Sequence, residues 1–473
     1  MLFHTPEFFV LLTAILALYY ALPKSRIVIM ALANAVFYAA TGAAYFVLFF
    51  GIVSLVYFLS RQLGSRYGKL VYGLSLLIVI GNLAFFKYSL FALHNVERAL
   101  GIQWLAMDSF LATVALPIGI SFYTFQLIAY LVDVRKGKLQ PSRSWIEFWV
   151  FISYFAHSLA GPILRGSDFL PQLERVADIR FSSSRFKLGL AYLCMGLVKK
   201  VVLADWITPY ADSFFVKGAA MSGGEAWVAA YLFAFQIYFD FSAYSEMAVG
   251  IGHMMGLRLD LNFKTPYLSG SATEFWRRWH ITLSSWIRDY IYIPLGGSRK
   301  GEIRQYANLI AAMAISGLWH GAAWTFVVWG LYHGGLQVVH KLYTGVLGKL
   351  GWSKLAESWL YRWLTVAVFF HLVCISWVLF RVEGIRTALH LIKKMLLLPQ
   401  LSFAGLAPYL LVAAALFLLH IAEYNVRKRA GTIAIYWHRY VPAFLRGAVY
   451  TAFIVFVILM MKSGQNNFIY FKF

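Results

Sequence analysis

One histidine lies inside a long stretch of the chain that lacks charged side chains. His320 belongs to the run Ser316-Gly317-Leu318-Trp319-His320-Gly321, and residues 306–339 contain no Lys, Arg, Asp or Glu. A straight helix over this stretch would measure roughly 50 Å, against about 30 Å for the apolar core of a bilayer. We expect Gly317 and Gly321 to break it into two halves or a sharp bend, which places His320 near the membrane midplane. An imidazole there can move a proton or act as a nucleophile, so His320 is the first candidate catalytic residue.

A second histidine follows an amphipathic aromatic segment, Glu274-Phe275-Trp276-Arg277-Arg278-Trp279-His280. Trp and Arg together favour the membrane interface, whereas the residues after His280 return to apolar surroundings. On its own, His280 could be a buried core histidine. Beside His320 it becomes a candidate catalytic partner, because one group can take a proton while another orients the acceptor.

Three hydrogen-bonding side chains fall at helical spacing in another apolar stretch. Gln236, Asp240 and Tyr244 stand at i, i+4 and i+8, so they share one face of a helix. Such a polar stripe cannot face lipid. Two interpretations stay open: a buried network that fastens helices together, or the wall of a wet cavity beside His320, to which Trp319 would also contribute.

Basic residues border the segments that carry the two histidines. Arg277, Arg278, Arg299 and Lys300 would form a rim that attracts an anionic donor from the cytosol. Alternatively they are topology signals, because positive charges collect in cytoplasmic loops. The charges that flank residues 306–339 on both sides place both ends of that stretch on the cytoplasmic side.

The amino-acid composition indicates which kind of secondary structure positions these residues. Of 473 residues, 61% are hydrophobic and 13% charged, which predicts an all-α polytopic membrane protein with one integral-membrane domain over residues 1–473. Continuous apolar windows predict about ten to twelve spans plus re-entrant or interfacial helices, and exclude an outer-membrane barrel. The net charge of +22 lies in short loops between spans, which predicts a lipid bilayer and not nucleic acid as the partner. Neither the two cysteines nor the spacing of the histidines predicts a metal site.

Several ordered motifs resemble one known family. Trp276–His280, the run Tyr292-Ile293-Pro294-Leu295-Gly296-Gly297 and Leu318-Trp319-His320-Gly321 are similar to the hallmark segments of membrane-bound O-acyltransferases (MBOAT), and most similar to the bacterial branch that O-acetylates alginate. Four further runs support the resemblance: residues 116–126, 160–163 and 199–205, and the C-terminal Phe468-Ile469-Tyr470-Phe471-Lys472-Phe473. Ala243 and Glu246 depart from the Gly and Asp of the family pattern, although the acid is retained.

The resemblance implies an MBOAT-like helical fold with a central buried histidine that is reached from both membrane faces. His320 falls on the invariant histidine of the family and His280 on a second, more variable position. The implied reaction moves acetyl from a cytosolic thioester such as acetyl-CoA, with no bound cofactor, across the bacterial inner membrane to an exopolysaccharide of the alginate or cellulose type. A periplasmic acetyltransferase partner and the polysaccharide assembly machinery would complete the transfer.

Three points stay open at this stage. A secondary transporter would also have broken helices and midplane polar groups, although the chain shows no inverted repeat. Within the same family, the acceptor could be peptidoglycan. The residues do not decide between direct transfer and an acetyl-histidine intermediate.

Overall fold

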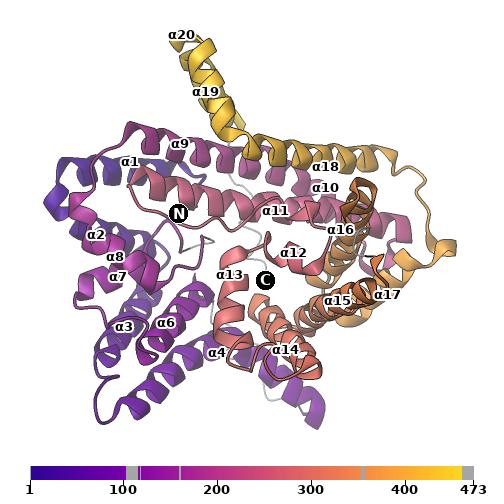
Figure 1. Cartoon of the computed structure of the whole chain (residues 1–473), viewed down its shortest axis with the longest axis horizontal. Coiled ribbons are helices and arrows are strands. Elements are labelled where there is room, and N and C mark those ends of the chain that lie inside the picture. Colours follow the sequence, from indigo (N-terminus) through magenta and orange to yellow (C-terminus); the bar gives the residue numbers. More distant parts are fainter. Residues whose placement is uncertain (1, 103–115, 118, 159–160, 353–356, 461–473) are drawn as a thin grey trace. The chain divides into compact units, whose positions relative to one another are not determined.

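A computed structural model describes residues 2–102, 116–117, 119–158, 161–352 and 357–460 (Figure 1). In these ranges every regular element is a helix, so the expected all-α fold class is confirmed. The C-terminal run Phe468–Phe473, used above as a family motif, lies outside the described residues, as do Ile118 and Ala160. The helices group into two compact units, and each is described here by itself; the expectation of one domain over residues 1–473 stays a prediction.

Unit 1 consists of Met1–Met195 and Tyr244–Leu261. Its helices are α1 (Pro6–Ala21), the 3-10 turn η1 (Pro23–Ser25), α2 (Arg26–Ala39), α3 (Ala43–Ser60), α4 (Gly68–Leu100), α6 (Ile120–Arg135), α7 (Trp145–Ser153), α8 (Gly166–Glu174), the 3-10 turn η2 (Val176–Asp178), α9 (Ser183–Leu197) up to Met195, and the last part of α11 (Gly223–Met254). Buried polar side chains hold α2 to α7. Asn34 donates to Ser153 Oγ at 3.0 Å and accepts from the backbone N–H of Phe155 at 3.0 Å, while the Trp149 indole donates to the Ala31 carbonyl at 3.2 Å.

Unit 2 consists of Gly196–Ala243 and Asn262–Phe473. Its elements before α14 are the π-helix η3 (Val198–Ala204), α10 (Asp205–Phe215), the 3-10 turn η4 (Gly218–Ala220), the first part of α11, the 3-10 turn η5 (Pro266–Leu268), α12 (Ala272–Trp276), α13 (Ile281–Ile287) and the π-helix η6 (Arg288–Tyr292). They continue with α14 (Glu302–His320), α15 (Trp324–Lys349), α16 (Trp359–Arg381), α17 (Ile385–Leu396), η8 (Leu398–Gln400), α18 (Ala407–Lys428), α19 (Ala430–Tyr440) and α20 (Ala443–Met460). Both candidate catalytic histidines belong to this unit.

Several of the described helices could cross a membrane. Four of them are long and apolar enough to cross a membrane unbroken, namely α3, α4, α16 and α18; α1 together with Pro23–Ala39 makes a fifth candidate, bent by 118°. The expectation of ten to twelve spans stays a prediction. Other apolar windows form shorter or bent helices, with breaks at residues such as Leu22 and Gly321.

Candidate active site

A tight helical hairpin positions His320. Helix α14 ends at this residue, the backbone is extended at Gly321 (φ −161°, ψ 152°) and at Ala323, and α15 begins at Trp324. The expectation of two helical halves with a break beside His320 is therefore confirmed. Only Gly321 lies at the break, however; Gly317 lies within α14, and its expected role as a helix breaker was wrong.

Glycines allow the two helices of the hairpin to touch along their backbones. A Cβ at Gly317 would overlap the Phe326 carbonyl oxygen, and one at Gly330 would overlap the carbonyl oxygen of Met313. Further along, a Cβ at Gly334 would lie 2.9 Å from the Cα of Ile310. Small residues at such a crossing are typical of closely packed membrane helices. The position of His320 therefore depends on contacts that only glycine permits.

Aromatic rings enclose the His320 imidazole, which is 2% exposed. The ring centroids of Trp319, Trp329 and Phe380 lie 4.9, 5.0 and 5.3 Å from that of His320, each at a steep angle between 71° and 84°. This packing removes bulk water from the ring and fixes its plane. Trp329 comes from α15 and Phe380 from α16, so three helices build the enclosure.

His280 is held in an uncommon backbone conformation. Its φ of 42° and ψ of 55° place a non-glycine residue in the left-handed region, directly before α13. Asn262 fixes this junction: its backbone carbonyl accepts from the Ile281 N–H at 3.0 Å, and its side-chain oxygen accepts from the Thr282 N–H and hydroxyl at 3.1 and 2.6 Å. Strain of this kind costs of order 1–3 kcal/mol and concentrates at functional sites. The buried Asn262 is a positioning residue that the sequence did not single out.

One indole contacts both candidate histidines. The Trp319 ring centroid lies 5.9 Å from that of His280 and 4.9 Å from that of His320. His280 is also packed edge-on against Phe241, with centroids 4.8 Å apart, and the side chains of His280, His320 and Trp319 are all buried. Two residues that are forty positions apart are therefore brought to the same tryptophan.

The polar stripe of α11 faces protein, as its chemistry requires. Gln236 donates to Thr208 Oγ1 at 2.9 Å, and Asp240 pairs with Lys200 at 2.9 Å. In unit 1, the Tyr244 hydroxyl is hydrogen-bonded to His4 Nδ1 at 3.1 Å. These contacts favour the interpretation that the stripe fastens segments together. Its role in lining a cavity beside His320 stays a prediction.

The four residues of the basic rim differ in how far they are already engaged. Arg277, Arg299 and Lys300 are exposed. Arg278 is less exposed, forms an ion pair with Glu274 at 2.9 Å and lies over the Tyr424 ring at 5.9 Å. Arg278 is therefore better placed to brace the segment before His280 than to hold a donor, whereas the other three remain accessible from solvent.

Glu274 ties this segment to the start of α16. Its two carboxylate oxygens accept from Arg362 at 2.7 and 2.8 Å, and one also accepts from the Gly270 N–H at 2.9 Å. Burial raises the pKa of the Glu274 carboxyl, but the hydrogen bonds from Arg362 and Gly270 outweigh it, so the pKa lies below its ordinary value of 4.5. The carboxylate stays charged and keeps the chain that leads to His280 in place.

A buried charge network in unit 2 was not identified as a site from the sequence. Glu423 accepts from Lys199 at 2.6 Å, from the Tyr238 hydroxyl at 2.8 Å and from Arg427 at 3.0 Å, and His420 Nδ1 lies 3.4 Å away. Nearby in the sequence, Lys200 pairs with both Asp205 and Asp240 at 2.9 Å. The available signal was a pair of lysines and a glutamate within apolar windows, since such charges persist only when paired.

A metal centre finds no support in the part of the chain that the structure describes. There, no group of three or more His, Cys, Asp or Glu side chains is arranged to hold an ion. The side chains at the candidate site that can transfer a proton or act as a nucleophile are the imidazoles of His280 and His320.

Comparison with known proteins identifies the family. Residues 140–380 match the MBOAT, membrane-bound O-acyltransferase family. The chain is 33% identical to the probable alginate O-acetylase AlgI of Pseudomonas putida, with 98% of each chain covered. It is 35% identical to a peptidoglycan O-acetyltransferase of Helicobacter pylori, over 80% of this chain and 75% of that one. A teichoic acid D-alanyltransferase of Bacillus subtilis is 26% identical over 56% of this chain and 68% of its own length. The chain therefore belongs to the membrane-bound O-acyltransferase family, as its motifs predicted, and is a membrane enzyme that transfers acyl groups to oxygen.

Proposed function

We propose that this enzyme takes acetyl from a cytosolic thioester, of which acetyl-CoA is the expected form, and passes it across the bacterial inner membrane for O-acetylation of an exopolysaccharide. The observation that carries the proposal is the contact of His280 and His320 with the same buried Trp319, in a chain that is similar over nearly its full length to an alginate O-acetylase.

The reaction requires one proton transfer and one exchange at a carbonyl carbon. The acceptor hydroxyl oxygen attacks the thioester carbon, the C–S bond breaks, and the thiolate leaves with the proton that the hydroxyl gave up. His320 serves as the base for that proton, or first holds the acetyl group itself. His280 orients the acceptor or the leaving group. The aromatic enclosure of His320 excludes water, which would otherwise hydrolyse an activated acetyl group.

The exposed members of the basic rim support an anionic donor. Coenzyme A carries several phosphate charges, and Arg277, Arg299 and Lys300 offer accessible cations near the segments that lead to the two histidines. An acceptor polymer outside the cell requires delivery of the acetyl group on that face. We therefore include a periplasmic acetyltransferase and the polysaccharide assembly machinery as partners in the proposal.

The test is loss of donor turnover in defined variants of the full chain. Inside-out membrane vesicles with matched amounts of each protein are supplied with acetyl-CoA and acceptor, and the release of free thiol is followed. We expect His320→Ala to lower the rate at least about a hundredfold, as for loss of a general base or nucleophile, and His280→Ala to leave a measurable remainder. His253→Ala, which removes an imidazole stacked on Tyr192 in unit 1, is the matched control and should retain native turnover. Native turnover of His320→Ala would contradict the assignment.

A second acceptor is supported by one comparison. The similarity to the Helicobacter pylori peptidoglycan O-acetyltransferase makes peptidoglycan the alternative polymer. Deleting the gene and measuring ester-linked acetate separately on peptidoglycan and on secreted polysaccharide distinguishes the two. The secondary-transporter alternative is set aside, because the chain belongs to the acyltransferase family.

A further inference from the structure

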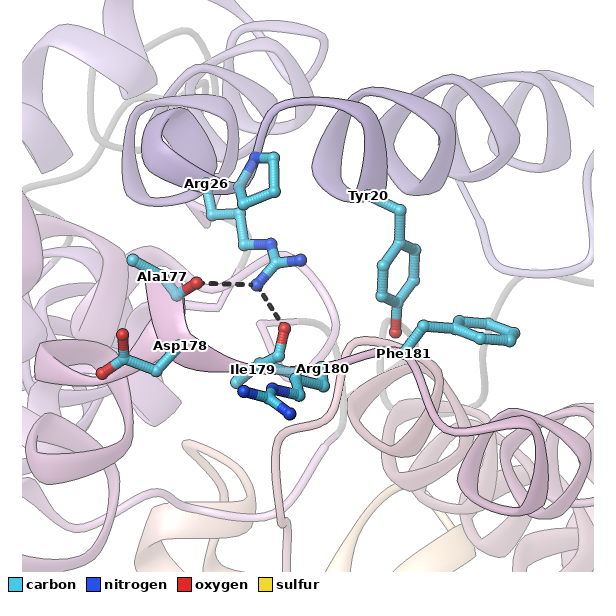
Figure 2. A pocket seen from close by; sticks show the side chains of 8 residues that line it. Tyr20, Arg26, Ala177, Asp178, Ile179, Arg180 and Phe181 are labelled. Carbon is cyan, nitrogen blue, oxygen red and sulfur yellow. Dashed lines mark hydrogen bonds between the residues drawn. The ribbon is translucent and has the colours of Figure 1, made fainter.

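A cavity in unit 1 lies at the bend between α1 and α2, in the unit that contains neither His280 nor His320. It has a volume of about 860 Å³ and is open to solvent. Its walls come from the end of α1, from η1 and the start of α2, and from η2 with the segment that follows (Figure 2); they are Tyr20, Pro23, Arg26, Ala177, Asp178, Ile179, Arg180 and Phe181. No step of the proposed reaction uses these residues.

The centre of the cavity wall is a buried arginine. Arg26 is 3% exposed, yet it is the first residue of a helix in an otherwise apolar part of the chain. Its Nε donates to the Tyr19 carbonyl at 2.8 Å, and its Nη1 donates to the carbonyls of Val176, Ala177 and Ile179 at 3.1, 3.2 and 2.6 Å. These bonds fix the guanidinium rigidly, while all its acceptors are neutral. The positive charge is therefore not balanced by any acid that it contacts.

One edge of this guanidinium remains available. Among the described residues, none accepts a hydrogen bond from Arg26 Nη2, and Figure 2 shows that nitrogen directed away from the bonded carbonyls, toward the side of the cavity where Tyr20 lies. Two N–H groups on a rigid, desolvated cation are suited to an oxyanion that can accept charge-assisted hydrogen bonds. Desolvating a cation without an acid beside it is costly, and the rings of Tyr19 and Tyr20, 4.7 and 5.6 Å from Cζ, and the four carbonyls offset part of that cost.

The remaining walls combine a second cation with aromatic surface. Arg180 is exposed and adds positive charge, and the single acid, Asp178, leaves the cavity with a positive balance. Phe181 is 59% exposed and packs edge-on against Tyr20 with centroids 5.2 Å apart. The Tyr20 hydroxyl already donates to the Met254 carbonyl at 2.6 Å, so Tyr20 presents its ring and not its hydroxyl. A charged group with an apolar remainder fits such walls.

The cavity lies at a basic bend between two apolar helices. The bend between α1 and α2 carries Lys24 beside Arg26. Apolar side chains on both helices are exposed, including Leu18 and Leu32. Basic groups at the end of an apolar span lie at the level of lipid headgroups and attract anionic ones.

We propose that this cavity binds the phosphate of a phosphate ester, with one phosphate oxygen on Arg26 Nη2 and the charge shared with Arg180. The ester is either the headgroup of an anionic phospholipid, whose acyl chains follow the exposed apolar faces of α1 and α2, or a small water-soluble phosphate. Both sources present the same oxyanion, and they differ in whether acyl chains contribute to binding.

The test compares ligands on the purified full-length protein in detergent. Thermal stability and the mass of bound adducts are measured with phosphatidylglycerol, with zwitterionic phosphatidylcholine and with inorganic phosphate. We expect phosphatidylglycerol or phosphate to raise the Tm and to be retained as one adduct. A lipid site responds to phosphatidylglycerol alone, whereas a soluble-phosphate site responds equally to inorganic phosphate.

Variants separate this site from nonspecific attraction of anions. Arg180→Gln removes one exposed cation without touching the buried bonds of Arg26, so it should fold normally and weaken phosphate binding about three- to tenfold. Lys136→Gln, which removes one exposed charge at the end of α6, is the matched control and should bind as the native protein does. The proposal is overturned if none of the ligands is retained, if phosphatidylcholine stabilises as strongly as phosphatidylglycerol, or if the two variants lose binding equally.

Discussion

Adding a single methyl group to the α14–α15 hairpin should affect catalysis far more than stability. In Gly330→Ala, the new Cβ would overlap the Met313 carbonyl oxygen and lie 3.0 Å from the Cα of Ala314. Ordinary contact between such atoms needs about 3.5–4 Å, so the helices must separate by roughly 1 Å at this point. Since α14 ends at His320, the separation reaches the candidate catalytic imidazole.

The opposing contributions to stability nearly cancel. Overpacking of a close-packed contact costs about 1–3 kcal/mol. Replacing glycine by alanine inside a helix stabilises the folded state by about 1 kcal/mol, so Gly330→Ala should lower the free energy of unfolding by roughly 0–2 kcal/mol in total. Displacing a reacting group by about 1 Å can cost about a hundredfold in rate. We therefore expect a small change in Tm and a fall in acyl-transfer rate of at least about tenfold.

Gly335→Ala provides the matched control on the same helix. A Cβ at Gly335 meets no atom within 4 Å, so this variant should gain up to about 1 kcal/mol of stability and keep native turnover. Both proteins are assayed in detergent for thermal unfolding and in vesicles for thiol release from the acyl donor. If Gly330→Ala turns over within about threefold of the native enzyme, close packing of the hairpin does not position the site, and the reasoning fails.

Three further predictions follow from the contacts of unit 2. Asp240→Asn removes one of two acids paired with Lys200, so it should lower the Tm while thiol release stays within about threefold of native; a fall of at least about tenfold would instead assign the Asp240 charge to the reaction. Neutralising Arg299 and Lys300 together should raise the apparent KM for an anionic donor more than it lowers kcat, and an unchanged KM with intact expression would reduce them to topology signals. Folding lowers the pKa of Glu274 below its ordinary value of 4.5, so the charged carboxylate stabilises the fold at pH values above 4.5. This stabilisation is lost as the pH falls through the lowered pKa and the carboxyl takes up a proton. The Tm deficit of Glu274→Gln should therefore be largest near pH 7 and shrink toward pH 4, and a deficit independent of pH would contradict the assignment.

Much of the candidate site could be predicted from the sequence because its signals are local. The charge-free stretch around His320 and the helical spacing of Gln236 and Asp240 depend only on neighbouring residues. Both stretches are helical, and these three side chains are buried. The role of Gly317 was predicted wrongly, since glycine permits both a break and a close approach, and only the partner helix distinguishes them.

The sequence by itself determined that this is an all-α membrane protein of the membrane-bound O-acyltransferase family, because composition and ordered motifs can be recognised without knowing how the helices pack. Only the tertiary structure decided which distant residues meet. The shared contact of His280 and His320 with Trp319, the support of His280 by Asn262 and the pairing of Lys199 with Glu423 join segments that are separated by many residues. Such pairings depend on how helices pack and on the requirement that buried charges are paired. The local periodicity of the sequence predicts neither.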